Sequence, residues 1–583
     1  MNWSDGSQIF HFGNRLLHGS VPYRDYVYQI GFLPIVTDAL AQRLAGEQFL
    51  SSLLVVFFLK GAAISCIYLI ARGFTSTGAA VLLAIGGAFI NPLLYAGGAH
   101  YYVECLFFAA TYLFVAGLGI PSALRCGLAG FSLAMIVAVR QGDGILLLLA
   151  CVVVLVIYAF RERDKYLWPM FAPALLGILA GLAVIAAMLA AHGALANAAT
   201  QLFIEGPEKK NIRLWQSSVD AITGGATGLG ELLKYNLTPA ALTLGVFYVM
   251  WRGRTPMSKR RSLVFGFVVG LAFVGFLRQQ VVVWREGAGF DAYAYANVLG
   301  YDVPRVLLTA VVPFSCFWPK RSEAALGIPH PVFSIVAAMT LALVWARQLS
   351  WSGRPLTDHG LLMCMTIVFA IMPATMSRQW KTTLCATFAA LTVGAFALQA
   401  LTHHSLTTYD GPYEANAFES DHPMLVHLKV TKEKVAALDF LRQHVTPGDS
   451  CFIYGSAPVL YTLLGCRNPT LIDSTYPDFF TPLDAAQAIE ALMARPPKWI
   501  IDKPNDPVPF YIGSPVLNTS AASGPLSQPR VAKLRTAMQS LIEDYQFVGS
   551  VDDFVAGTKR DPQIRDPDFD WIARLRLYQR IVR

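Results

Sequence analysis

Charged side chains are scarce in this chain, since Asp, Glu, Lys and Arg make up only 14% of its 583 residues. Soluble domains carry about a quarter charged residues, so this composition excludes a soluble enzyme. Hydrophobic residues make up 55%, which excludes a disordered chain. The 9 cysteines are too few for a disulfide-rich scaffold. The class that remains is an integral membrane protein.

Common signatures of nucleotide and metal sites are also missing from the sequence. The segment Gly455-Ser456-Ala457-Pro458 lacks the GxxxxGK(S/T) spacing of a phosphate-binding loop. His403, His404 and the other histidines show no zinc-ligand spacing. We therefore expect no required cofactor.

Long hydrophobic runs are frequent. A membrane-spanning helix needs about 20 apolar residues, and twelve stretches come close to that length. They lie near residues 48–72, 77–95, 102–118, 124–139, 144–160, 167–191, 238–252, 263–283, 303–319, 328–346, 359–376 and 382–401. The sequence thus predicts a multi-pass α-helical membrane protein with about 12 transmembrane helices.

Basic residues orient the predicted spans, because cytoplasmic loops collect Lys and Arg. The strongest cluster lies at 252–261, and every second loop agrees with it. The alternate loops then face outward, among them residues 1–47, 192–237 and 284–302. The net charge of +8 is therefore largely a matter of topology, and we expect no nucleic-acid partner.

Three regions follow from this topology. Residues 1–47 form a first extracytoplasmic loop, residues 48–401 form the transmembrane domain with a long outer loop at 192–237, and residues 402–583 form an extracytoplasmic α/β domain. Because the first loop already lies outside, we expect one further helix to precede it in the full-length protein.

The C-terminal region alternates helix and strand patterns. Helices are predicted at 431–444, 457–465, 484–494 and 530–545, and strands at 451–455, 469–473 and 498–502. Cys451 and Cys466 lie in this region, outside the membrane, where oxidation can occur. The sequence alone leaves a disulfide between them open.

The first loop contains two amphipathic stretches. The first begins at Ser4 and places Ile9, Phe12 and Leu16 on one side. The second runs from Leu33 to Leu44 with Pro34 in its first turn, where proline is tolerated. Two helices lying on the outer membrane surface fit this pattern.

Several short segments carry a resemblance to a known group of enzymes. Asp5 opens the first amphipathic stretch, Gly19-Ser20-Val21-Pro22-Tyr23-Arg24-Asp25 follows it, and Pro34 opens the second stretch. His100-Tyr101-Tyr102-Val103-Glu104 begins a later span, and Arg140 precedes another. In these features the chain resembles the GT-C superfamily of membrane glycosyltransferases, above all the protein O-mannosyltransferase and aminoarabinose–lipid A transferase type.

Two positions depart from the pattern of that type. Gly6 stands where those enzymes have the second residue of an Asp-Glu pair. Gln29-Ile30-Gly31-Phe32-Leu33-Pro34 stands where they have a His-Pro-Pro or Lys-Pro-Pro turn. These departures weaken an assignment to protein mannosylation or lipid A modification and leave the superfamily resemblance intact.

The resemblance implies a polyprenyl-phosphate sugar donor and an inverting single displacement. Such a reaction needs a carboxylate that accepts the proton of the acceptor hydroxyl, and cations that stabilise the leaving phosphate. We interpret Asp5 as the general base and Asp25 as a second carboxylate that positions the acceptor or assists. Substrate-binding residues are expected at Tyr23, Arg24, His100, Glu104, Arg140, Arg278 and Arg285.

Each candidate also has a structural interpretation that the sequence leaves open. Asp5 could simply cap the first surface helix, and Asp25 could be a solvated loop acid. Glu104 could be solvated at the membrane boundary, and Arg140 could pair with Asp143. No metal is required, although Asp5, Asp25 and Glu104 could bind one divalent cation through oxygen ligands.

The function predicted is an inner (plasma) membrane glycosyltransferase that moves a sugar from a polyprenyl-phosphate donor to a glycan, lipid or protein outside. The main alternative is a secondary transporter, which would place charges at the membrane midplane rather than at the outer surface. A polysaccharide polymerase or ligase is a further alternative. Such enzymes usually concentrate Arg in their outer loops, whereas Arg is scattered in those loops here.

Overall fold

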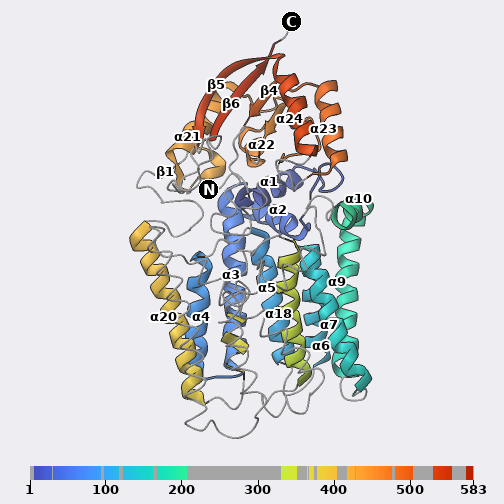
Figure 1. Ribbon diagram of the computed structural model, residues 1–583, viewed down its shortest axis with the longest axis vertical. Helices are drawn as coiled ribbons and strands as arrows, with labels where there is room; N and C mark the ends of the chain where they lie inside the picture. Colours follow the sequence, from blue (N-terminus) through green and yellow to red (C-terminus); the bar gives the residue numbers. More distant parts are fainter. Residues whose placement is uncertain are drawn as a thin grey trace, which may run out of the picture. The chain divides into compact units, whose positions relative to one another are not determined.

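The computed structural model is shown in Figure 1. It describes residues 5–28, 30–93, 98–116, 122–161, 167–205, 330–350, 364–365, 367–369, 371–372, 377–403, 417–419, 421–426, 429–455, 457–475, 480–502, 529–553 and 573–581. The chain forms two compact units. Unit 1 comprises Met1–Phe57, Ala186–Asn211 and His403–Arg583, and unit 2 comprises Phe58–Ile185 and Ile212–Thr402.

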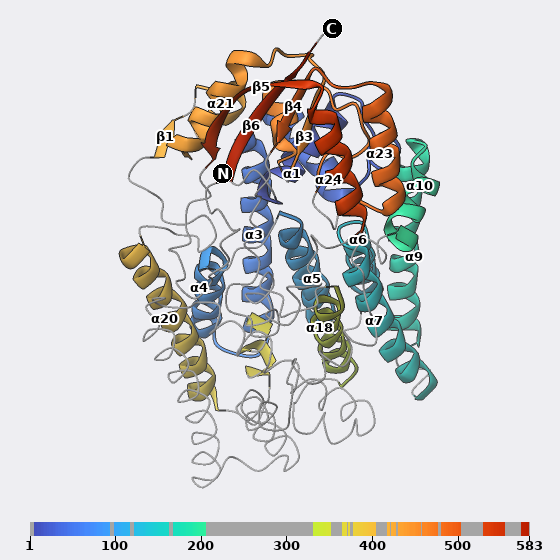
Figure 2. The same cartoon turned by 45° about the horizontal axis from the view of Figure 1, so that its top comes forward.

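Unit 2 is helical, and its helices run alongside one another in both views (Figures 1 and 2). Its complete helices are α4 (Thr77–Leu93), α5 (Gly98–Ala116), α6 (Ala123–Val137), α7 (Gln141–Arg161), the π-helical turn η1 (Leu167–Phe171) and α18 (His330–Ser350). Most of α3 (Phe49–Arg72), α9 (Ala172–Ala191) and α20 (Arg378–His403) also belongs to this unit. These bounds follow the hydrophobic runs seen in the sequence.

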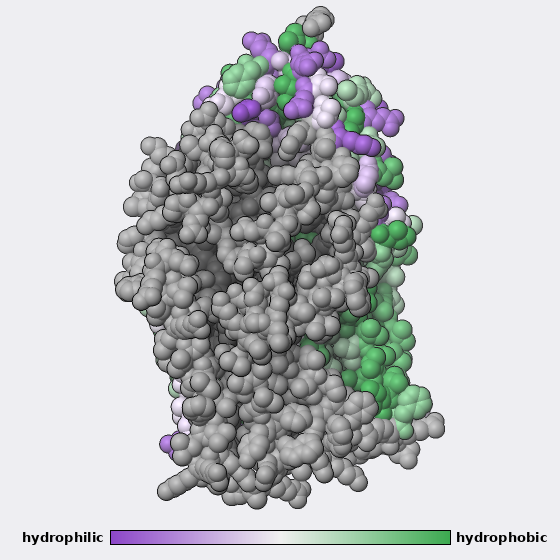
Figure 3. Space-filling view, viewed as in Figure 1, coloured by the Kyte–Doolittle hydropathy of each residue, from purple (hydrophilic) through white to green (hydrophobic). Residues whose placement is uncertain are grey.

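Four helical stretches are long and apolar enough to cross a membrane: Phe49–Arg72, Ala99–Ala116, Gln141–Phe160 and Trp168–Ala191. Large apolar side chains on them are exposed, with Phe58 at 76% and Phe160 at 87%. Hydrophobic surface also gathers along α9 (Figure 3). A soluble protein would bury such surface, so the chain is an integral membrane protein with several candidate spans.

The predicted spans at 238–252, 263–283 and 303–319 lie outside the described residues, as does most of 359–376. The total of twelve spans therefore stays a prediction. The segment 192–237, predicted as a loop, begins with the short helix α10 (Leu195–Ala199) and the π-helical turn η2 (Thr200–Ile204).

Glycines allow α6 and α9 to touch backbone to backbone. A Cβ atom on Gly177 would collide with the carbonyl oxygen of Gly127, and one on Gly130 would collide with that of Ala174. Small residues in this role let membrane helices approach closely, where dispersion contacts hold them together.

The C-terminal part of unit 1 is a layered α/β fold around a mixed sheet of four strands. They are β3 (Cys451–Tyr454), β4 (Trp499–Asp502), β5 (Tyr545–Asp553) and β6 (Ala573–Arg580), in the order β3-β4-β6-β5. β3 and β4 run parallel, and the other two pairs are antiparallel.

Side chains alternate between the two faces of this sheet, as a strand requires. Cys451 and Ile453 join the core under α21 (Lys432–His444) and α22 (Val459–Leu464). Phe452 faces the opposite core, formed with α23 (Pro482–Ala494) and α24 (Pro529–Ile542). A separate antiparallel pair consists of β1 (Ala417–Glu419) and β2 (Lys429–Thr431).

The strand predicted at 469–473 is wrong. Asn468 donates from Nδ2 to the carbonyl of Ile472 (2.7 Å), and its Oδ1 accepts from the backbone N–H of Thr470 (2.9 Å). These side-chain bonds close a turn in place of a strand ladder. The strands β5 and β6 were not predicted.

The two amphipathic stretches near the N-terminus form α1 (Asp5–Leu17) and α2 (Leu33–Ala45), as predicted, and they pack on each other. Phe10 of α1 lies in the core with α22 and packs edge-on against Phe49, with ring centroids 5.5 Å apart. Residues 8–14 of α1 are all buried. Protein thus encloses α1 more completely than it would a helix with one face in lipid.

Candidate functional site

The loop between α1 and α2 holds three of the predicted site residues in one tight turn. Tyr23 has φ 67°, and its backbone N–H donates to the carbonyl of Tyr26 (3.0 Å). The Tyr23 hydroxyl is buried and donates to the carbonyl of Ile30 (2.6 Å). A left-handed tyrosine is uncommon, so the surrounding contacts impose this backbone conformation.

Asp25 closes the turn. Its Oδ2 accepts from the backbone N–H of Val21 (2.7 Å), and Arg24 forms a two-pronged ion pair with the carboxylate at 2.8 and 2.9 Å. The hydrogen bonds from Arg24 are the main cause of the lowered pKa of Asp25. Asp25 is therefore ionised at neutral pH and has a clear structural role.

Gln201 of η2 clamps the same turn from another part of unit 1. Its Nε2 donates to the carbonyl of Tyr23 (3.0 Å), and its Oε1 accepts from the backbone N–H of Tyr28 (3.1 Å). Arg24 also donates to the carbonyl of His192 (3.3 Å). Sequence reasoning missed Gln201, because nothing in the apolar segment around it marks one glutamine.

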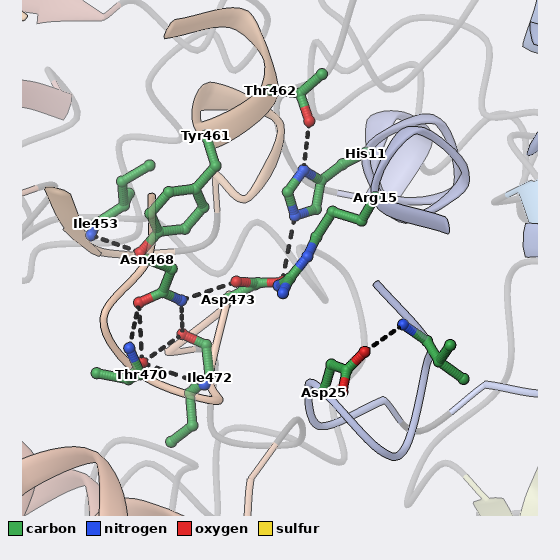
Figure 4. Close-up of polar contacts among 11 residues, drawn as sticks. His11, Arg15, Asp25, Ile453, Tyr461, Thr462, Asn468, Thr470, Ile472 and Asp473 are labelled. Atoms are coloured by element: carbon green, nitrogen blue, oxygen red, sulfur yellow. Dashed lines mark hydrogen bonds and ion pairs between the residues drawn. The ribbon is translucent and has the colours of Figure 1, made fainter. Parts of the chain in front are cut away.

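A buried polar cluster joins α1 to the turn at 468–473 (Figure 4). Asp473 forms an ion pair with Arg15, and its Oδ2 lies 3.3 Å from Nε2 of His11. Asn468 donates to its Oδ1 (2.7 Å), and Nδ1 of His11 lies 2.6 Å from the hydroxyl of Thr462. The one sequence signal was two basic side chains, at positions 11 and 15, one turn apart on an apolar helix.

Charge and burial act in opposite directions on this cluster. Burial raises the pKa of Asp473, but the Arg15 guanidinium and the bonds from His11 and Asn468 outweigh it, and the pKa falls well below its usual range. Burial lowers the pKa of His11 by more than Asp473 raises it. At neutral pH the cluster therefore holds a carboxylate, a guanidinium and a neutral imidazole.

Aromatic rings cover this cluster. The guanidinium of Arg15 lies 4.3 Å from the centre of the Tyr26 ring, which stacks on Phe12 at 5.0 Å. Tyr28 meets Phe12 edge-on at 4.7 Å. A cation held over an aromatic face and away from water gains about 2 kcal/mol, so the rings help to retain Arg15 here.

Asp5 is the first residue of α1. Gln8, one turn further on, is 2% exposed, and its Nε2 has no hydrogen-bond partner in the part of the chain described. Residues three apart share a helix face, so Asp5 and Gln8 lie on one side of α1.

The remaining predicted residues belong to unit 2. His100 and Glu104 are buried one turn apart on α5. Arg140, between α6 and α7, donates from Nη1 to the His100 ring (2.9 Å to Nε2) and pairs with Asp143 at 3.4 Å. The predicted alternative for Arg140, pairing with Asp143, is therefore present. Arg278 and Arg285 lie outside the described residues.

Within each unit, the predicted residues partly come together. Unit 1 joins Tyr23, Arg24 and Asp25 in one turn, and unit 2 joins His100 to Arg140. Among the described residues, no group of three His, Cys, Asp or Glu side chains could hold a metal ion. None of these contacts tests the catalytic roles, which stay predictions.

No family model matches the sequence, and no curated protein matches it. Among solved structures, the chain is similar to the archaeal oligosaccharyltransferase AglB from Archaeoglobus fulgidus, in complex with an inhibitory peptide and a dolichol-phosphate. That likeness has a TM-score of 0.43 and 12% identity, and covers 94% of this chain and 69% of that chain.

Two further structures are similar. ArnT from Cupriavidus metallidurans, bound to undecaprenyl phosphate, has a TM-score of 0.38 and 13% identity, with 89% of this chain and 90% of that chain covered. An Archaeoglobus fulgidus oligosaccharyltransferase in complex with Zn and sulfate has a TM-score of 0.35 and 13% identity, with 86% and 64% covered. Since all three TM-scores are below 0.5 and the identities are 12–13%, the function is argued from the chain's own residues.

Proposed function

We propose that this chain is an integral-membrane glycosyltransferase that moves a sugar from a polyprenyl-phosphate donor to an acceptor outside the cytoplasm. The observation that carries the proposal is the placement of Asp5. It begins α1, and buried contacts enclose that helix along residues 8–14. A base works best when its orientation is fixed before the substrate binds, and α1 supplies that rigidity.

In the proposed reaction, Asp5 accepts the proton of the acceptor hydroxyl as that oxygen attacks the anomeric carbon of the donor sugar. The bond from that carbon to the donor phosphate breaks in the same step, so the configuration inverts. The two similar solved structures with bound dolichol-phosphate and undecaprenyl phosphate support a lipid-phosphate donor. The acceptor remains open among a glycan, a lipid and a protein.

The leaving phosphate needs cationic donors, and Arg140 is our candidate. The Arg140 side chain is 14% exposed, and contacts with His100 and Asp143 hold its orientation. A guanidinium fixed in this way can offer two parallel N–H groups to a phosphate. Glu104, on the same face of α5 as His100, is proposed to help to align the substrate.

A secondary transporter is the second candidate, because Lys60 lies in the middle of the span α3. Its ammonium group lies 4.5 Å from the centre of the Tyr101 ring on α5. Ionisable groups within a membrane often mark a transport path. The ion pair between Arg140 and Asp143 lies at the first turn of α7 rather than in the middle of a span, so a transport path has less support.

One experiment separates the two candidates. Surface glycans and lipid-linked sugars are compared between cells with and without the gene, by mass spectrometry with linkage analysis. If the chain is a glycosyltransferase, cells without the gene should lack one glycosidic linkage and should accumulate its lipid-phosphate sugar. Loss of the gene with every linkage retained would contradict the proposed function.

A further inference from the structure

The contact between α1 and the turn at 468–473 joins segments more than 450 residues apart in sequence. Asp473 has a side chain only 1% exposed and pairs with Arg15. Burying a charged pair is costly, and apolar side chains could fill the same space at no loss of stability. What ionic and hydrogen-bonded groups add is direction, because each bond fixes an angle as well as a distance.

The hydrogen-bond directions in this cluster are determined by chemistry. The ionised carboxylate of Asp473 can only accept, so Nε2 of His11 carries the ring proton. In the neutral ring Nδ1 must then accept, and the hydroxyl of Thr462 donates to it. One rotation of α1 about its axis satisfies both bonds and the ion pair to Arg15 together.

A contact with α2 restrains α1 from a second direction. A Cβ atom on Gly13 would collide with Oδ2 of Asp38, so the two helices touch at that point. Phe10, between these contacts, is fully buried in the core with α22. These contacts restrain α1 from both sides.

The helical period carries this restraint to the N-terminal end of α1. Asp5, Gln8, His11 and Arg15 follow each other at intervals of three, three and four residues. His11 and Arg15 are one turn apart on one face, and because a helix moves as a unit, a rotation of α1 moves Asp5 together with them. The position of Asp5 therefore depends on the anchor at His11 and Arg15.

We propose that Asp473 is a positioning residue, which holds α1 through Arg15 and His11 and so fixes the orientation of Asp5. This inference rests on the proposed function, in which Asp5 is the base. It gives the C-terminal region a part in the reaction without any contact with the substrate.

The test compares Asp473→Asn with the matched control Asp449→Asn. Asp449 is also an ion-paired carboxylate of the C-terminal region, but it accepts from Lys498 (3.0 Å) and from the indole N–H of Trp499 (2.9 Å), within its own domain. Thr462→Val is a milder variant, which removes only the hydroxyl that donates to His11. Each variant is the full chain in lipid nanodiscs.

Two quantities are measured. Hydrogen–deuterium exchange of the peptide amides of residues 8–17 reports how often α1 leaves its place. Turnover is measured with a polyprenyl-phosphate sugar and divided by the number of sites that bind polyprenyl phosphate. Unfolded protein in the sample then does not lower the measured turnover. We expect Asp473→Asn to speed exchange in α1 and to lower turnover per binding site, each at least tenfold. Thr462→Val should change both in the same direction by a smaller factor, and Asp449→Asn should change neither more than twofold.

Unchanged exchange in α1 of Asp473→Asn, an equal effect of Asp449→Asn, or full turnover per binding site would overturn the positioning role. If Asp473→Asn does not fold, Thr462→Val decides by the same criteria. Absence of sugar transfer in the wild-type protein would contradict the proposed function instead. The exchange data would then still decide whether Asp473 holds α1.

Discussion

At the scale of single residues, carboxylates of unit 1 take different charge states because their surroundings differ. Asp25 is partly exposed and Asp473 is buried, yet a guanidinium keeps each of them ionised. Asp38 is buried, and no cation pairs with it among the residues that the structure describes. Burial raises its pKa to about 6, against 3.8 for a free side chain, despite a bond from Gln42 (2.6 Å). The same side chain thus stabilises or destabilises the fold according to its partner.

Asp38 predicts a pH dependence of stability. Because the folded chain holds the Asp38 proton more tightly than the unfolded chain, the contribution of Asp38 to stability is greatest below about pH 4 and is lost as the pH rises through 6. Asp38→Asn should remove this penalty of up to about 3 kcal/mol. In thermal unfolding, we expect it to raise the melting temperature at pH 7.5 and to leave it nearly unchanged at pH 4.

Asp449→Asn should shift the melting temperature in the opposite direction. Burial acts to raise the pKa of Asp449, but bonds from Lys498 and Trp499 lower it overall. That carboxylate stabilises the fold above its unfolded pKa, so its replacement should lower the melting temperature more at pH 7.5 than at pH 4. If Asp38→Asn melts at a lower temperature than the wild-type protein at pH 7.5, the ionised Asp38 carboxylate does not destabilise the fold.

At the scale of elements, periodic patterns predicted what local sequence determines. The apolar positions of 4–17 and 33–44 predicted α1 and α2, and the buried runs predicted β3 and β4. The predicted strand at 469–473 failed because side-chain bonds from Asn468 replace the ladder. The sequences of β5 and β6 mix charged and apolar residues, so no clear strand pattern marks them.

The helix pair α6–α9 gives a prediction about packing. Gly177→Ala would place a methyl group against the carbonyl oxygen of Gly127, and the two backbones would have to separate. We expect a loss of stability of about 1–3 kcal/mol, seen as a lower melting temperature in detergent. Gly61→Ala in α3, where a methyl group meets nothing within 4 Å, is the control and should be neutral or slightly stabilising. Equal melting temperatures for both variants would show that α6 and α9 do not pack in this way.

At the scale of the whole molecule, unit 1 is assembled from three separate stretches of sequence, Met1–Phe57, Ala186–Asn211 and His403–Arg583. Composition predicted the membrane class, and short motifs near Asp5, Asp25 and Arg140 predicted the candidate site residues. The sequence could not show the contacts of Gln201 and Asp473, because both join segments far apart in the chain. Such pairings depend on the folded topology rather than on local pattern.

We propose that Asp5 is the general base of a lipid-phosphate sugar transfer. Its most direct test is turnover by purified wild-type protein and Asp5→Asn in nanodiscs, with a polyprenyl-phosphate sugar donor and the acceptor found from the glycan comparison. Asparagine keeps the size of the side chain but cannot take up the proton. We predict that Asp5→Asn loses at least a hundredfold in turnover while its melting temperature and donor binding are unchanged. Wild-type turnover in Asp5→Asn would contradict the account.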